Sequence, residues 1–168
     1  MEIARGLPLA LLLAFGFFFF DAGMARAQAE PGDDEAAVMA VVDSALVLIS
    51  AEDFVGFTAL KLEEAPAFIS FERGGEPDYR FRSPAAQRTA TTDADLVERG
   101  FEPVVQVSGH LASVWLPYDF YTNGEWSHCG VDAFILLRTG DGWRIASMAW
   151  TVEQPPACRP HPDGPPGG

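Results

Sequence analysis

From residue 35 to residue 50, apolar residues recur at the three- and four-residue spacing of an amphipathic helix. The stripe comprises Val38, Val41, Val42, Ala45, Leu48 and Ile49. Residues 50–53 then have the form of a capping box, which predicts a second helix that ends before Pro66. Ser83 followed by Pro84 is typical of a helix N-cap, so a third helix is predicted through about Thr91.

Runs rich in β-branched and aromatic residues predict strands around these helices. The segments 67–73 and 79–82 flank a glycine- and proline-containing turn and predict a short hairpin. Four longer strands are predicted at 102–108, 111–122, 126–139 and 143–152. Helices followed by an antiparallel meander predict an α+β fold, a domain whose N-terminal helices pack on one face of a curved, mainly antiparallel sheet.

The register of the central hairpin can be counted from its turn. Asn123-Gly124 favours a two-residue turn with positive backbone φ at both positions. The pairs that follow are Asp119 with His128, Trp115 with Asp132, and Ser113 with Phe134. Because side chains alternate across a strand, these residues would share one sheet face, where polar and large apolar groups mix as in a ligand pocket. The opposite face would be almost wholly apolar.

Three residues on the mixed face are candidate catalytic residues. Asp119, paired to His128, would orient the imidazole and raise its basicity, which suits acid–base chemistry near neutral pH. Asp132 would have a raised pKa if buried and could donate a proton or act as a base. The alternative for the Asp119–His128 pair is a surface contact without function.

Four further residues are candidate ligand contacts. Trp115, Ser113 and Phe134 belong to the same predicted face, and Asp43 interrupts an apolar helix. Asp43 either lies on the solvent-exposed side of that helix or points into the interior of the domain.

The ends of the chain differ in composition from the predicted domain, 28–154. An apolar run at 7–20 and small residues at Ala25 and Ala27 predict a signal peptide, 1–27, and export to the bacterial periplasm or the medium. A spanning helix needs about 20 apolar residues, so we expect no stable membrane anchor. Residues 155–168 form a Pro/Gly-rich tail, expected to be ordered only near Cys158.

The net charge, the two cysteines and the absence of cofactor motifs limit the classes of partner and cofactor that we expect for this protein. The formal net charge of −13 argues against nucleic acid and anionic membranes, which need clustered cations. Export favours a Cys129–Cys158 disulfide, worth roughly 3 kcal/mol by loop closure, over a buried free Cys129 and a thiol in the tail. No phosphate-binding glycine loop is present, and no family spacing supports a metal triad of His128, Asp119 and Asp132, so we expect neither cofactor nor metal.

Three motifs in adjacent predicted strands resemble the nuclear transport factor 2-like superfamily, in its SnoaL-like and ketosteroid isomerase-like branch. They are Val114-Trp115-x-Pro117-Tyr118-Asp119-Phe120, His128-Cys129-Gly130-Val131-Asp132-x-Phe134 and Gly142-Trp143-Arg144-Ile145-Ala146-Ser147. The resemblance covers residues 33–152 and implies a cone that encloses a cavity and commonly dimerises through its sheet.

The resemblance also implies site residues. In ketosteroid isomerase-like members an aspartate followed two residues later by Phe hydrogen-bonds the ligand oxygen, and Asp132 and Phe134 match this pattern. The first helix lacks the Tyr of those enzymes and offers only Asp43, and no second base is evident. Of the histidines and aspartate that activate water in scytalone dehydratase-like members, only His128 has a match.

Two hypotheses remain. The first is an exported domain that binds a small apolar ligand, with isomerase, cyclase or dehydratase chemistry on an apolar carbonyl compound as candidate activity. In it His128 transfers the proton, Asp119 orients it and Asp132 stabilises an enolate-like oxygen. The second is a non-catalytic envelope module whose apolar sheet face forms a homodimer or binds a partner.

Overall fold

The computed structural model describes residues 31–167, so the predicted signal peptide lies outside the described residues. In chain order the elements are α1 (Pro31–Ser50), α2 (Phe54–Ala59), β1 (Ala67–Arg73), β2 (Glu76–Arg82), α3 (Pro84–Arg88), β3 (Leu96–Gly100), β4 (Val104–Ser108), β5 (Leu111–Thr122), β6 (Glu125–Thr139) and β7 (Gly142–Val152). No helix within 31–167 is long and apolar enough to cross a bilayer.

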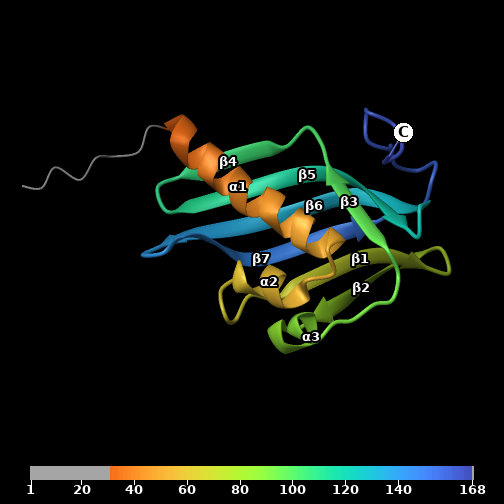
Figure 1. Cartoon of the computed structure of the whole chain (residues 1–168), viewed down its shortest axis with the longest axis horizontal. Helices are drawn as coiled ribbons and strands as arrows, with labels where there is room; N and C mark the ends of the chain where they lie inside the picture. Colours follow the sequence, from red (N-terminus) through yellow and green to blue (C-terminus); the bar gives the residue numbers. More distant parts are fainter. Residues whose placement is uncertain (1–30, 168) are drawn as a thin grey trace, which may run out of the picture.

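The strands form one sheet in the order β2-β1-β7-β6-β5-β3, and β4 pairs with the other half of β5. Only β1 and β7 run parallel, so the sheet is mainly antiparallel. In Figure 1 helix α1 crosses one face of the sheet, while α2 and α3 lie beside β1 and β2. The predicted α+β fold class is confirmed.

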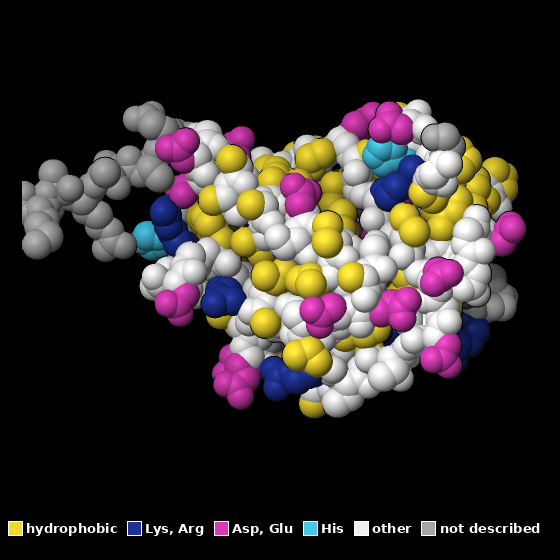
Figure 2. Space-filling model, in the orientation of Figure 1, with side chains coloured by type: hydrophobic (Ala, Val, Ile, Leu, Met, Phe, Trp, Pro, Cys, Tyr) yellow, Lys and Arg dark blue, Asp and Glu magenta, His cyan; other side chains and the backbone are white. Residues whose placement is uncertain are grey.

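The core forms where α1 meets the sheet. Val38, Val42 and Ala45, spaced to share one helix face, are fully buried against inward residues such as Leu116 and Phe134. Acidic side chains are scattered over the visible outer surface, in keeping with the net charge (Figure 2).

The helix signals are confirmed with small shifts. Helix α1 begins at Pro31, and α2 is capped by Asp53, whose carboxylate accepts the Gly56 N–H at 2.7 Å. The Ser50 hydroxyl instead accepts the Glu98 N–H at 2.9 Å, which attaches the end of α1 to β3. Ser83 caps α3 as predicted, although α3 ends at Arg88.

The register counted from the turn is wrong beyond its first two pairs. Asn123 and Gly124 form the turn with φ of 54° and 80°, and Tyr121 lies opposite Trp126. The next pair is Phe120 with His128, because Ser127 is an extra residue in β6 and forms a β-bulge. Every later pair is therefore displaced by one position.

A displacement of one residue moves side chains to the other face of the sheet. Asp119 lies opposite Cys129 rather than His128, and Asp132 lies opposite Leu116. A second irregularity, between β6 and β7, places Asp132 opposite Trp150. The inner face, which α1 covers, therefore carries His128, Asp132 and Phe134, whereas the outer face carries Ser113, Trp115 and Asp119.

Two segments differ from the sequence-based prediction. Strand β3 is not among the predicted elements, and the predicted strand at 102–108 begins only at Val104. The C-terminal tail packs on the outer face through a Cys129–Cys158 disulfide with a Cα–Cα distance of 5.9 Å. Arg159 forms an ion pair with Glu102, so the tail is held beyond Cys158.

Candidate functional site

The inner face of the sheet borders a cavity of about 1140 Å³. Its walls come from α2 and α3, from β1 and β2, and from the inward side chains of β3, β5, β6 and β7. Aromatic and aliphatic side chains line about half of it, and among the polar lining residues Glu98, His128 and Asp132 lie on the neighbouring strands β3 and β6. A large apolar cavity with few converging polar groups is typical of a small-molecule site.

Two carboxyl groups meet in this cavity. Asp132 is 1% exposed, and its side chain shares a hydrogen bond with that of Glu98, which projects inward from β3 opposite Phe120. With both groups ionised, Asp132 Oδ2 would have no hydrogen-bond donor within the described residues. A proton held between the two carboxyl groups gives this buried oxygen a hydrogen-bond partner.

The electrostatics of the pair agree with this geometry. Burial, and then the charge of Glu98 and the hydrogen bond to it, raise the pKa of Asp132 well above its usual value. Burial raises the pKa of Glu98 to about 7, although the hydrogen bond from Asp132 acts in the opposite direction. Glu98 keeps part of its surface accessible because it lines the cavity. Near neutral pH the pair thus shares one proton.

Tyr118 supports the carboxyl pair from β5. Its hydroxyl donates to the Thr151 carbonyl oxygen at 2.7 Å, and burial, followed by the nearby Asp132, raises its pKa far above the physiological range. It lies opposite Gly130, where an added Cβ would come within 2.4 Å of Thr151 O. The glycine therefore allows this close approach of β7, and Tyr118 remains a neutral, fixed side chain.

His128 enters the cavity because of the bulge at Ser127. Its ring stacks on Phe120 at 4.6 Å between centroids and meets Tyr118 edge-on at 5.8 Å. Its Nδ1 contacts the Ser127 hydroxyl at 3.0 Å, which leaves Nε2 for a ligand. Burial lowers the pKa of His128, so the imidazole is neutral at pH 7.

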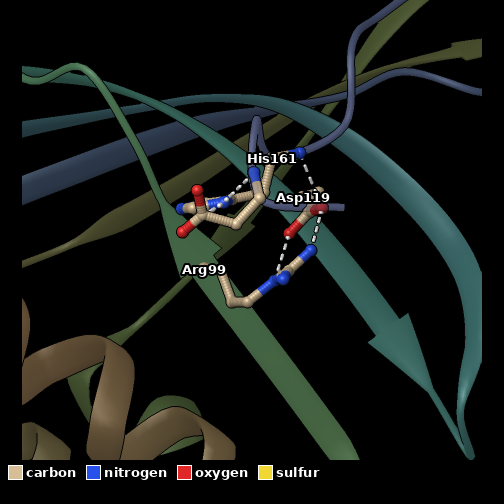
Figure 3. Close-up of polar contacts among 4 residues, drawn as sticks. Arg99, Asp119 and His161 are labelled. Carbon is tan, nitrogen blue, oxygen red and sulfur yellow. Dashed lines mark hydrogen bonds and ion pairs between the residues drawn. The ribbon is translucent and has the colours of Figure 1, made fainter. Parts of the chain in front are cut away.

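Asp119 belongs to a different structure, on the outer face. Arg99 of β3 donates to it twice, from Nε at 3.0 Å and from Nη2 at 2.6 Å, and the His161 backbone N–H donates at 2.9 Å (Figure 3). The Asp119 side chain is fully buried by these partners. Its placement corrects the predicted Asp119–His128 pair: Asp119 anchors β3 and the C-terminal tail.

The four predicted ligand contacts do not line the cavity. Trp115 is 56% exposed on the outer face, and Ser113 on the same face contacts Gln106 at 3.4 Å. Phe134 points inward but is completely buried in the core, and Asp43 lies on the exposed side of α1. Within residues 31–167 no three His, Cys, Asp or Glu side chains are grouped to hold a metal ion.

Sequence reasoning missed Glu98 because its strand was not recognised. The segment Leu96–Gly100 contains two charged residues and no strong apolar alternation. One signal was available, since Arg99 is opposite in charge to Asp119 and such pairs occur across strands. Pairing Arg99 with Asp119 would have placed the neighbouring Glu98 on the inner face.

These features define the class of fold: a cone-like α+β domain with a ligand-sized cavity between its helices and sheet. Neither models of protein families nor curated protein sequences match this chain. Solved structures do match, and the protein has the nuclear transport factor 2-like fold that its three motifs resemble.

Three of these structures illustrate the similarity. A β subunit of a candidate aromatic-ring-hydroxylating dioxygenase from Novosphingobium aromaticivorans has a TM-score of 0.61 at 13% identity, covering 73% of this chain and 91% of that one. A protein of unknown function from Pseudomonas putida has a TM-score of 0.58 at 13% identity, with coverage of 82% and 100%. A candidate dehydratase from Streptomyces avermitilis has a TM-score of 0.56 at 17% identity, covering 73% of this chain and 98% of that one.

Proposed function

We propose that the protein binds a small carbonyl compound in this cavity and removes a proton from the carbon next to the carbonyl group, a step that isomerases, cyclases and dehydratases can share. The observation that carries the proposal is the proton-sharing pair of Glu98 and Asp132 in the cavity, close to the aromatic side chains of Tyr118 and Phe120. A general base works best when its pKa lies near the working pH, and the Glu98 pKa of about 7 satisfies this condition.

The two carboxyl groups have distinct tasks in the proposed reaction. When the ligand binds, protonated Asp132 exchanges its hydrogen bond to Glu98 for one to the carbonyl oxygen, and ionised Glu98 accepts a proton from the neighbouring carbon. The C–H electron pair becomes the C=C bond of an enolate, and the displaced carbonyl pair remains on the oxygen that accepts the hydrogen bond of Asp132. Glu98 then returns the proton to another carbon. Neutral His128 flanks the ligand and offers Nε2 as a further hydrogen-bonding group.

Exchange of α-protons in D₂O tests this function without knowledge of the natural substrate. The protein is expected to accelerate α-deuteration of ketones that contain an aromatic ring, such as 2-tetralone, measured by proton NMR. Asp132→Asn and Glu98→Gln should each lower the exchange rate about 10²- to 10⁴-fold, the range for loss of a general acid or base.

Ser113→Ala provides the matched control, because Ser113 lies on the outer face away from the cavity. This variant should exchange ketone protons at the wild-type rate. An unchanged rate in both Asp132→Asn and Glu98→Gln, with the fold intact by circular dichroism, would contradict the proposed function.

We also propose that the protein is exported, to the periplasm or the medium. The apolar leader at 7–20 and the Cys129–Cys158 disulfide support this proposal, because structural disulfides persist in oxidising compartments.

A second candidate function uses the outer sheet face. Apolar side chains are exposed on β4, β5 and β6, and those that share this face are Val104, Leu111, Trp115, Ile135 and Leu137, here called the outer apolar patch. Trp115 and Val104 lie directly opposite one another, and each is 56% exposed. Such a patch favours a second copy of the chain as its partner.

Substitution of Trp115 tests the proposed dimer. Trp115→Asp should raise the dimer dissociation constant at least thirtyfold, about 2 kcal/mol, because a buried Trp is a typical interface hot spot. Val47→Asp is the control, since Val47 is 66% exposed on α1, outside the patch. Sedimentation equilibrium that finds the wild-type protein monomeric at micromolar concentration would contradict the proposal.

A further inference from the structure

Two arginines project into the cavity from β2. Arg80 pairs with Ile69 and Arg82 with Ala67, and both partners are buried inward-facing residues of β1. Arg80 and Arg82 accordingly share the inner face of the sheet, and both line the cavity. Arg82 is half-buried, whereas Arg80 is exposed and marks the side open to solvent.

Neither guanidinium has a carboxylate partner among residues 31–167. Arg73 of the same hairpin, by contrast, forms an ion pair with Asp78 at 3.1 Å. The two arginines instead lie over aromatic rings, Arg80 over Phe71 at 5.6 Å and Arg82 over Trp150 at 5.9 Å.

The placement of the two arginines is unfavourable for the empty protein. Burial, and then the charge of Arg80, lower the pKa of Arg82, although an arginine stays charged at physiological pH. Two like charges that face a cavity without an anion repel one another. An anionic group bound between them would remove this cost and match the forked donors of guanidinium.

The register relates the arginines to the carboxyl pair. Asp132 lies opposite Trp150, Trp150 opposite Ile69, and Ile69 opposite Arg80, which forms one row across the sheet. Three interstrand spacings separate the backbones of Asp132 and Arg80 by about 14 Å. Trp150 and Ile69 provide the apolar floor between these two polar ends.

We propose that the cavity ligand is an elongated organic carboxylate, whose anionic end is bound by Arg80 and Arg82 and whose apolar body lies over Trp150. The other end then reaches the carboxyl pair. That this other end carries the reacting carbonyl group rests on the proposed function, whereas the anion site at Arg80 and Arg82 does not. Because the whole chain carries a net charge of −13 and repels anions, a preference for an anion can arise only from a local site.

Binding of two matched probes tests the anion site. Biphenyl-4-carboxylate and biphenyl-4-methanol have nearly the same shape and differ in charge, and neither carries a ketone for the proposed reaction. Titration calorimetry of the full mature chain should find the carboxylate bound at least tenfold more tightly. Arg80→Gln/Arg82→Gln should abolish this preference and leave binding of the alcohol within about twofold.

The control variant Arg73→Gln/Arg88→Gln also removes two positive charges, but from residues outside the cavity lining. It should keep the preference for the carboxylate probe. Asp132→Asn should keep it as well, even where proton exchange is lost, so the two proposals can fail separately. Equal binding of both probes to the wild-type protein, or no saturable binding of the carboxylate at millimolar concentration, would overturn the inference. If Arg73→Gln/Arg88→Gln lost the preference for the carboxylate as fully as Arg80→Gln/Arg82→Gln, the inference would also be overturned. Only variants with the circular dichroism spectrum of the wild-type protein are compared.

Discussion

Replacement of Asp119 with alanine is expected to lower the free energy of unfolding by about 3–4 kcal/mol, measured by urea denaturation at pH 7. The substitution removes the partner of Arg99, whose side chain is only 19% exposed, and leaves that guanidinium charge largely buried. It also removes the acceptor of the His161 N–H, which holds the C-terminal tail. Both losses follow from the outer-face position of Asp119.

Asp34→Ala is the matched control for this experiment. Asp34 also accepts two hydrogen bonds from an arginine, Arg138, but this arginine is 37% exposed. Loss of an exposed pair should cost less than about 1 kcal/mol. The double variant Arg99→Met/Asp119→Leu should recover much of the stability, because it leaves no unpaired charge. A loss below 1 kcal/mol for Asp119→Ala would contradict the assigned anchoring role.

Stability is expected to fall as the pH rises from about 4 to about 8, and Asp132→Asn should remove the part of this fall that comes from the raised pKa of Asp132. The folded protein holds the Glu98 proton up to a pKa of about 7, whereas unfolded glutamate releases it near pH 4.3. A carboxyl group whose pKa is higher in the folded state binds its proton more tightly there, and this tighter binding stabilises the fold. The contribution is complete below the pKa of the unfolded state, and it is lost as the pH rises through the pKa of the folded state. Glu98 alone should account for about 2 kcal/mol, allowing for its partial accessibility.

The effect of Asp132→Asn follows from the same linkage. An asparagine carries no proton to lose and can donate an N–H to ionised Glu98. The variant should therefore be about 2 kcal/mol more stable than the wild-type protein at pH 8 and similar at pH 4.5, while it loses exchange activity. Asp43→Asn, at an exposed position, should give a curve parallel to the wild type. A wild-type curve that is flat from pH 5 to pH 8 would contradict the buried acid pair.

The structure agrees with the predicted position of Asp132 and His128 on a cavity-lining face, and it differs for the residues of β5 that were assigned to that face. Asp132 lies in the cavity because inward and outward positions alternate regularly along β6 beyond the bulge. Asp119 and Trp115 were assigned to the face of Asp132 only by counting from the turn. One extra residue, Ser127, reversed that assignment for all of β5 relative to β6.

Local chemistry therefore determined much of this protein from its sequence alone. The turn at Asn123-Gly124, the cap at Ser83 and the apolar stripe of α1 each depend on neighbouring residues, and together they were sufficient for the fold class. Only the tertiary structure decided the contact of Glu98 with Asp132 and the inward turn of Arg80 and Arg82. These depend on a bulge and on pairings between distant strands, whose stability comes from packing on both sides of the sheet rather than from the preferences of adjacent residues.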